Sequence, residues 1–381
     1  MYIVDWKRTP VGKFLGALAH IPATQLTKPL FSYFLENYPY LKKKTDEVII
    51  GNVIGAGIGM NPARIAAITG GMSYHVPAYT INHACASGMN AVVQGFRAIR
   101  LGDAHMVLAG GMESMSQAPF LVKGIRTGIK FGSTSLIDSL HNDGFYCCLS
   151  KDIVGVLTET LSKKYSINRK NQDLFTLASH HKAVKAQEAK NFADEIIPVG
   201  QLQTDEAPRK DTSLEKLSSL KPAFKPHGTI TAGNASSLND GAALTLLASR
   251  KAVQKYELKP MAQILDAVFV GLKPELMGMG PQIAIKKLLQ KNKLTIADID
   301  VFEINEAFAV QVLAVLQTLD IDESKLNING GALAIGHPLG MSGTRIIGSL
   351  ITALKQTGGK LGIASLCVGG GQGAAILIKN L

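Results

Sequence analysis

The stretch Ile81-Asn-His-Ala-Cys-Ala-Ser-Gly-Met-Asn-Ala-Val-Val93 sets a single cysteine where a predicted strand ends and a predicted helix begins. After Cys85, apolar residues recur at the spacing of one buried helical face until Leu101-Gly102, where glycine is the usual C-terminal cap. We therefore expect Cys85 at or just before a helix N-terminus. There the free backbone N–H groups and the helix dipole stabilise a thiolate, the form of cysteine that attacks carbonyl carbons.

Two interpretations of Cys85 stand at this point. Free cysteine is commonly a buried, inert residue, so a structural role is the simpler one. The small side chains around it favour a nucleophile, because they would let an acyl group approach the sulfur; they are Ala84, Ala86, Ser87 and Gly88. The choice depends on motifs far downstream.

The composition is that of an ordinary folded protein. Of its 381 residues, 46% are hydrophobic and 18% are charged, and the length suggests two or three folding units. No apolar run approaches the roughly 20 residues that span a bilayer, so we expect no membrane insertion. The N-terminal residues lack the order of regions of a signal peptide, which predicts a cytoplasmic protein. Four cysteines without paired metal-type spacing argue against a disulfide framework and against a metal site.

The formal net charge of +11 indicates an anionic partner. Basic residues are scattered over presumed helices, with Lys42-Lys-Lys44 the one run, and no alternation of aromatic and basic residues appears. This distribution fits a small polyphosphate ligand better than a nucleic acid.

The pattern of apolar runs and polar loops changes twice along the chain. Residues 1–115 alternate short apolar runs with helical patterns bounded by glycine, which is the rhythm of βαβ units in a buried sheet. Residues 116–238 are rich in polar loops and charged stretches, and the alternation returns after them. We therefore predict an N-terminal half from 1–115 plus 239–259, an inserted loop domain at 116–238, and a C-terminal half at 260–381.

The two halves resemble each other in the order of their elements. The strand, Cys85 loop, helix and strand of the first half are matched by a strand at 326–328, a loop with Gly336-His-Pro338, a helix and the strand at 361–366. Duplicated halves would place their corresponding loops at one shared interface. Periodicity alone leaves this open, since any α/β protein shows such alternation.

Chemically capable residues follow the predicted strands of the second half. His337 stands before Pro338 in a glycine-rich segment, Cys367 ends an apolar strand, and Asn305 and Glu306 end another. Strand ends are where α/β folds collect their sites. Glu306 fits a structural role as well as a functional one.

At these residues the chain resembles the thiolase family, from Arg8-Thr-Pro to the C-terminus. The Cys85 segment, the Asn327–Gly343 segment and Cys367-Val-Gly-Gly-Gly371 each fit a long pattern of that family, and the Asn305-Glu-Ala-Phe308 and Gly233-Asn-Ala-Ser236 boxes lie in the expected order. The resemblance implies an α/β thiolase fold. In it, two similar mixed-sheet βαβ halves form α/β/α/β/α layers and carry an inserted loop lobe.

The resemblance also implies a two-step acyl transfer. Cys85 would attack the 3-keto carbon of a 3-ketoacyl-CoA, His337 would activate the sulfur, and Cys367 would exchange a proton with the acetyl-CoA carbanion. His337 and a water held by Asn305 would stabilise the enolate oxygen. The backbone N–H groups of Cys85 and Gly369 would hold the thioester oxygen.

For the coenzyme, the inserted lobe offers residues that match family positions. Arg209 would pack on the adenine, where a flat guanidinium stacks well. Residues expected near the pantetheine and the substrate are Phe224, Ala232, Ser236 and Phe308. The resemblance implies coenzyme A as a substrate, no permanently bound cofactor or metal, and a homodimer or homotetramer.

The predicted reaction is reversible cleavage of acetoacetyl-CoA to two acetyl-CoA. One departure leaves acyl-chain length open: Ile153-Val-Gly155 stands where short-chain thiolases have His-Met-Gly, and the preceding segment contains Cys147-Cys148. The alternatives are a long-chain 3-ketoacyl-CoA thiolase of fatty-acid β-oxidation, and a catalytically inert acyl-CoA binding protein or complex subunit. A decarboxylating ketosynthase of the same superfamily is disfavoured, because it would carry a histidine or asparagine in place of Cys367.

Overall fold

The computed structural model describes residues 1–381 and is built on one ten-stranded mixed sheet. Along the sheet the strands follow the order β12-β13-β14-β11-β1-β10-β5-β3-β4, and β2 pairs with β10. Their bounds are β1 Tyr2–Arg8, β2 Gly12–Lys13, β3 Glu47–Gly51, β4 Ala78–Ile81, β5 Met106–Ser114, β10 Asn239–Ala248, β11 Ala262–Gly271, β12 Val301–Ile304, β13 Leu361–Val368 and β14 Gln372–Asn380.

The sheet has two halves that repeat one topology. Outward from the centre, β1-β10-β5-β3 in one half corresponds to β11-β14-β13-β12 in the other, with strands taken in the same order along the chain. The halves join where β1 pairs with β11 in antiparallel register, Tyr2 opposite Gln263 and Ile3 opposite Ala262. This topology supports the internal repeat predicted from the sequence.

The predicted strand at 326–328 does not form. Only a single parallel bridge joins Phe302 to Leu326, and Asn327 has a φ of +43°. The Asn327 side chain replaces the backbone hydrogen bonds of a strand pair. Its Oδ1 accepts from the N–H of Ile304 and its Nδ2 donates to the Ile304 carbonyl, both at 2.9 Å. The second half therefore lacks a full counterpart of β4.

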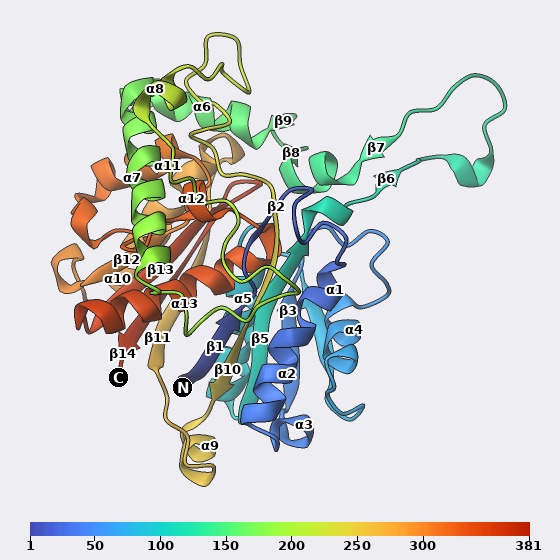
Figure 1. The fold of residues 1–381 in the computed structure, drawn as a ribbon, viewed down its shortest axis with the longest axis vertical. Helices are drawn as coiled ribbons and strands as arrows, with labels where there is room; N and C mark the ends of the chain where they lie inside the picture. Colours follow the sequence, from blue (N-terminus) through green and yellow to red (C-terminus); the bar gives the residue numbers. More distant parts are fainter.

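Two helices lie between the halves of the sheet (Figure 1). They are α5 (Ser87–Leu101) and α13 (Leu339–Thr357), and their apolar side chains share one core with β5, β13 and β14. The other face of each half is covered by shorter helices, so five layers alternate as predicted. The covering helices are α1 Ala23–Leu26, α2 Lys28–Asn37, α3 Leu41–Lys44 and α4 Pro62–Thr69 on the first half, and α10 Gly280–Asn292 and α11 Ala309–Leu319 on the second.

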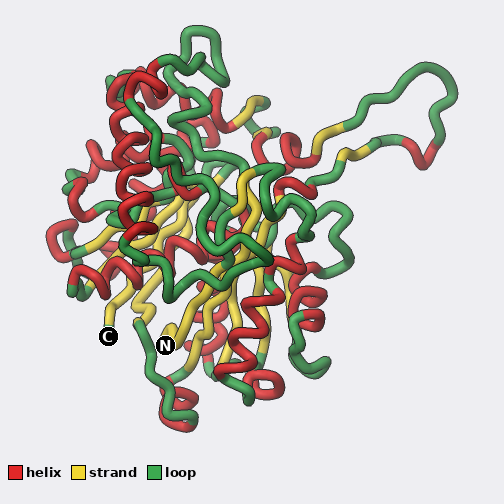
Figure 2. The backbone as a smooth tube through the Cα atoms, viewed as in Figure 1, coloured by secondary structure: helices red, strands yellow, loops and turns green.

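Residues 116–238 form helices and long loops above the sheet, including an arm around residues 118–139 that projects from the body (Figure 2). Helical elements here are α6 Val154–Lys164, α7 Arg169–Glu188, α8 Leu214–Ser218 and a π-helical turn at Leu140–Phe145. Short strands are β6 Phe120–Leu121, β7 Ile137–Asp138, β8 Tyr146–Cys147 and β9 Asp152–Ile153. A 3-10 turn lies in the arm at Ile125–Thr127, and another at Met115–Gln117 begins the segment. Elsewhere the chain forms α9 Arg250–Lys255, α12 Ala332–Ile335 and 3-10 turns at Pro274–Met279, Ile296–Asp298 and Glu323–Lys325.

A buried arginine attaches residues 190–205 to the sheet. Arg8, 1% exposed at the end of β1, donates to Glu195 at 2.7 Å and to both oxygens of Asp205 at 2.6 and 2.9 Å. A pair of this kind is costly to break from one side, because the remaining charge stays buried.

The division into two halves and an inserted domain, with the boundaries given above, stays a prediction. None of the helices combines the length and apolar character that crossing a membrane requires.

Candidate active site

Cys85 lies between the end of β4 and the first turn of α5, as predicted. It is partly exposed, and the residue before it, Ala84, has a φ of +43°, which an L-residue rarely adopts. The turn is closed by hydrogen bonds from Ala86 N–H to the His83 carbonyl and from the Ser87 hydroxyl to the Ala84 carbonyl, at 3.0 and 2.7 Å. This tight turn sets the sulfur at the head of the helix.

Close glycine contacts bring the N-termini of α5 and α13 together. A Cβ added to Gly88 would lie 2.7 Å from the Gly340 carbonyl oxygen, and one added to Gly343 would lie 2.3 Å from the Met89 nitrogen. No larger residue fits at either position unless the helices separate. Since Cys85 precedes α5 and His337 precedes α13, this crossing places the two side chains in one region.

The backbone of His337 is fixed by its neighbours. Gly336 has a φ of +111°, and a Cβ there would lie 2.4 Å from the Asn239 side chain. Asn239 in turn accepts a hydrogen bond from the His337 N–H at 3.0 Å. Glycine before His337 is therefore required both by its conformation and by the packing of Asn239.

The imidazole of His337 is held at both nitrogens. Nδ1 lies 2.6 Å from the Ser342 hydroxyl, which donates to the Pro338 carbonyl at 2.8 Å, while Nε2 lies 3.3 Å from Nδ2 of Asn305. Because the Ser342 hydrogen is given to Pro338, Nδ1 carries the proton and donates to Ser342. Nε2 is then the basic nitrogen.

Burial keeps this imidazole neutral. His337 is 4% exposed, and desolvation, reinforced by the positive charge of Arg345, lowers its pKa to about 3. An imidazolium here forms only together with a nearby negative charge. The site therefore suits a base that receives a proton as a thiolate or an oxyanion appears.

The predicted resting thiolate of Cys85 is not supported. The backbone N–H groups of Gly369 and Cys85 do lower the pKa of its thiol, but desolvation and the charge of Glu113 act the other way, and the pKa rises to about 11. Burial outweighs the helix N-terminus, so the resting group is a thiol. The two N–H groups that act on the sulfur are those predicted to bind the thioester oxygen.

Cys367 ends up beside Cys85. It lies in β13 with no exposed surface, and burial together with the Cys85 charge raises its pKa. After it, Gly369 leads into the turn to β14, where Gly370 and Gly371 have φ values of +81° and +82°. A Cβ on Gly369 would meet nothing within 4 Å, so the space that a side chain would fill there is open.

Three of the four predicted substrate contacts in the lobe and at α11 adjoin the apolar cluster that contains Cys367. The rings of Phe224 and Phe308 pack edge to face with centroids 5.9 Å apart; Phe308 belongs to the apolar cluster that contains Cys367, and the half-buried Phe224 packs against it. The Ser236 N–H donates to the Ala307 carbonyl at 2.9 Å, which ties the lobe to the start of α11. Ala232 lies exposed on the same loop.

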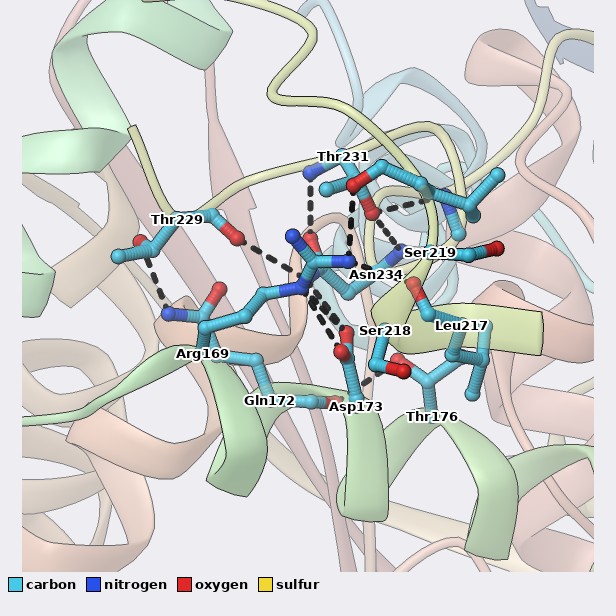
Figure 3. A network of polar contacts seen from close by, with 12 residues as sticks. Arg169, Gln172, Asp173, Thr176, Leu217, Ser218, Ser219, Thr229, Thr231 and Asn234 are labelled. Atoms are coloured by element: carbon cyan, nitrogen blue, oxygen red, sulfur yellow. Dashed lines mark hydrogen bonds and ion pairs between the residues drawn. The ribbon is translucent and has the colours of Figure 1, made fainter. Parts of the chain in front are cut away.

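A polar network holds that loop in place (Figure 3). Asn234 donates to Asp173 at 3.0 Å and accepts from the Thr231 N–H at 2.8 Å, and Arg169 bonds both oxygens of Asp173 at 2.8 and 2.9 Å. The network joins α7 to the loop that bears Ala232 and Ser236. The asparagine of the Gly233-Asn-Ala-Ser236 box thus has a structural role.

Arg209 lies apart from this group. Its side chain is exposed, and its backbone N–H donates to His180 Nδ1 on α7 at 3.1 Å. No hydrogen bond connects it with Phe224, Ala232 or Ser236. Its contact with an adenine stays a prediction.

Two residues at the site were not identified from the sequence. Glu113, fully buried at the end of β5, accepts from Asn52 and from the N–H groups of Val53, Ile54 and Gly340, at 2.8 to 3.1 Å. Desolvation raises its pKa to about 7. Glu113 could have been identified from the sequence as the acidic residue of the otherwise apolar segment Gly110-Gly-Met-Glu113. The second residue that was not identified is Ser342, the hydrogen-bond partner of His337.

Glu306 is bonded as a structural residue. Its carboxylate accepts from Ser179, Asn327 and the Leu333 N–H, at 2.6, 2.7 and 3.1 Å. Asn305 beside it faces the site, and its Oδ1 has no partner within the protein. The two neighbours in the Asn305-Glu-Ala-Phe308 box thus serve different purposes.

Comparison with known families agrees with this constellation. The sequence model "Thiolase, N-terminal domain" matches residues 1–251, and "Thiolase, C-terminal domain" matches residues 258–380. The chain belongs to the thiolase family. Among relatives, it is 44% identical to an acetyl-CoA acetyltransferase of Pseudomonas aeruginosa, over 99% of this chain and 98% of that one. It is also 44% identical to a probable acetyl-CoA acyltransferase of Staphylococcus aureus, over 98% and 97%.

Solved thiolase structures superpose over the whole chain. The acetyl-CoA acetyltransferase of Bacillus anthracis matches with a TM-score of 0.97 at 40% identity, over 100% of this chain and 98% of that one. Human mitochondrial 3-ketoacyl-CoA thiolase in complex with CoA matches with a TM-score of 0.96 at the same identity and coverage. The fold prediction is therefore confirmed, and the protein is an acyltransferase of the thiolase type.

Proposed function

We propose that this thiolase cleaves acetoacetyl-CoA with coenzyme A to give two acetyl-CoA, and catalyses the reverse Claisen condensation, through an acyl group on Cys85. The observation that carries the proposal is a pair of contacts, Asn305 with His337 at 3.3 Å and Cys367 beside Cys85, on segments that the crossing of α5 and α13 draws together. The names of the relatives support the same reaction.

In the first half-reaction, the Cys85 proton passes to His337 Nε2 as the sulfur adds to the 3-keto carbon. The C2–C3 bond then breaks, which leaves an acyl thioester on Cys85 and the enolate of acetyl-CoA. Nε2–H of His337 and a water on the free Oδ1 of Asn305 stabilise the enolate oxygen. The Cys367 thiol protonates C2 and releases acetyl-CoA.

In the second half-reaction, coenzyme A gives its thiol proton to the Cys367 thiolate and attacks the acyl carbon. The N–H groups of Cys85 and Gly369 hold the acyl oxygen as it becomes negative, and each such donor contributes roughly 3 kcal/mol. The Cys85 thiolate then recovers its proton from His337. Both cysteines return to the neutral thiols favoured by their raised pKa values.

A short acyl group fits the apolar cluster against which Cys85 packs. Its buried members are Val53, Ile54, Met115, Leu140 and Leu339. Gly144 of the π-helical turn borders this cluster, because a Cβ there would lie 3.3 Å from Leu339 and 3.4 Å from Ile54. Filled side-chain packing close to the nucleophile favours an acetyl group over a long chain.

We also propose a homo-oligomer in the cytoplasm. Strand β4 forms an edge of the sheet, with Tyr79 39% exposed, and an unpaired edge can join that of a second copy. The projecting arm carries exposed apolar side chains that a second contact would cover; they are Ile125, Ile129, Phe131 and Leu136. Free thiols at the site need a reducing compartment, which the cytoplasm provides.

The test compares kcat/KM for CoA-dependent cleavage of acetoacetyl-CoA and of a long-chain 3-ketoacyl-CoA, with Cys85→Ala as the blank. We expect kcat/KM to be much higher for acetoacetyl-CoA than for the long-chain substrate, and we expect no turnover by the variant. A much higher kcat/KM for the long-chain substrate would assign the long-chain thiolase instead. Activity on neither substrate would favour an acyl-CoA binding protein, and full activity of Cys85→Ala would refute the mechanism.

A further inference from the structure

The two N–H groups that act on the Cys85 sulfur come from different halves of the molecule. One belongs to Cys85 itself, at the head of α5, and the other to Gly369, in the turn between β13 and β14. Hydrogen-bond donors for an oxyanion work only at the right separation, and a shift of about 1 Å can cost 10²-fold in rate. Something must therefore fix the distance between these two loops.

A single side-chain hydrogen bond joins the two loops. His83 Nε2 lies 3.0 Å from Oε1 of Gln372, and no other side-chain bond connects residues 82–86 with residues 367–372. An amide oxygen only accepts, so Nε2 of His83 carries the proton and donates it. His83 stands two residues before the nucleophile, and Gln372 stands three residues after Gly369.

Both ends of this bond are anchored. The backbone N–H of His83 donates to the Ser87 hydroxyl at 2.8 Å, and its ring packs on Phe269 of β11 with centroids 5.0 Å apart. Gln372 pairs with Val368 across the hairpin and with Gly271 on β11. A displacement of either partner would therefore move the loop that carries an oxyanion donor.

We infer that His83 is a positioning residue that, through Gln372, sets the separation of the Cys85 and Gly369 N–H groups for acyl transfer. The inference deepens the proposed function and rests on it. His83 takes no proton in this role; it acts by holding one loop against the other. The bond should therefore affect steps that pass through an oxyanion more strongly than other reactions of Cys85.

The experiment uses His83→Ala, Gln372→Ala, the double variant and the conservative His83→Gln, whose amide N–H can still donate to Gln372. We expect kcat for acetoacetyl-CoA cleavage to fall about 10- to 100-fold in each alanine variant, with KM for coenzyme A within twofold. The double variant should lose no more than the single ones, because both remove the same bond. His83→Gln should recover most of the activity.

Alkylation of Cys85 by iodoacetamide provides a second readout. This displacement creates no carbonyl oxyanion and depends on the two N–H groups only through the fraction of thiolate, so in His83→Ala its rate should fall much less than kcat. Gln94→Ala, which removes a 2.9 Å hydrogen bond to Asn90 within α5 and joins no loops, is the matched control and should keep full kcat.

Three outcomes would overturn the inference. They are a kcat of His83→Ala within twofold of wild type, additive losses in the double variant, or an equal loss of alkylation and acyl transfer, which would indicate general disorder of the Cys85 loop. Failure of the proposed function would look different, since the wild-type protein itself would then show no cleavage above the Cys85→Ala blank.

Discussion

The Nδ1 atom of His337 lies 2.6 Å from the hydroxyl oxygen of Ser342, one turn into the helix that His337 precedes. Since the hydroxyl hydrogen is directed to the Pro338 carbonyl, this contact selects the tautomer with a basic Nε2. The same helix that crosses α5 thus also orients the base.

Ser342→Ala should lower kcat by about tenfold or more. Without the Ser342 hydroxyl, neither the tautomer nor the ring orientation of His337 is fixed, and part of the roughly 10²- to 10⁴-fold rate enhancement that a general base supplies is lost. KM for coenzyme A should change little. Steady-state cleavage kinetics check this. Ser349→Ala is the control, since Ser349 is buried on the same helix but contacts Arg345, and a loss of equal size there would point to helix damage.

Alkylation of Cys85 should accelerate with pH. With a pKa of about 11, the thiolate fraction rises about tenfold for each pH unit below that value, so the iodoacetamide rate constant should rise about 100-fold from pH 7 to pH 9. Labelling is followed by mass spectrometry, with Cys85→Ala reporting the background from exposed Cys148. A plateau below pH 8 would show that the resting group is a thiolate.

Gly343→Ala should destabilise the protein. Its Cβ would lie 2.3 Å from the backbone nitrogen of Met89, and overpacking of this kind costs about 1 to 3 kcal/mol. Thermal unfolding should show a lower Tm. Gly369→Ala is the comparison: its Cβ meets nothing within 4 Å, so Tm should hold while kcat falls, because the methyl group enters the space beside the N–H donor. Equal Tm values for both variants would contradict the tight helix crossing.

Gly144→Ala should sharpen the preference for short substrates. The new methyl group would lie against Ile54 and Leu339 and reduce the space beside Cys85. One methylene in an apolar pocket changes kcat/KM by roughly 10- to 200-fold, so a six-carbon 3-ketoacyl-CoA should lose at least tenfold more than acetoacetyl-CoA. Gly271→Ala, with open space around its Cβ, is the control. Equal losses on both substrates would place the acyl group elsewhere.

The parts of the fold that the sequence predicted well are those with strong local signals. The strand before Cys85 and the helix after it agree with the structure, because the apolar spacing of one helical face and the Gly102 cap are local signals. The strand at 326–328 was wrong, since an asparagine side chain replaces its ladder. That replacement depends on a partner more than twenty residues away, which periodicity cannot show.

The site was predictable as a set of residues and not as a set of protonation states. Motifs identified Cys85, His337 and Cys367, but burial, which results from packing of both halves, reversed the expected pKa shift of the nucleophile. Glu113, Ser342 and the bond of His83 to Gln372 were missed for the same reason. Each acquires its role from contacts that the folded chain alone creates.

The meeting of α5 and α13 through glycine also has a consequence for folding. Cys85 and His337 are about 250 residues apart in the chain, so the nucleophile and its base come within reach only after a very long loop has closed. During refolding, secondary structure and each local core can form before this docking occurs. During refolding, catalytic turnover should therefore recover more slowly than secondary structure, so the rate at which activity returns measures how fast the two halves dock.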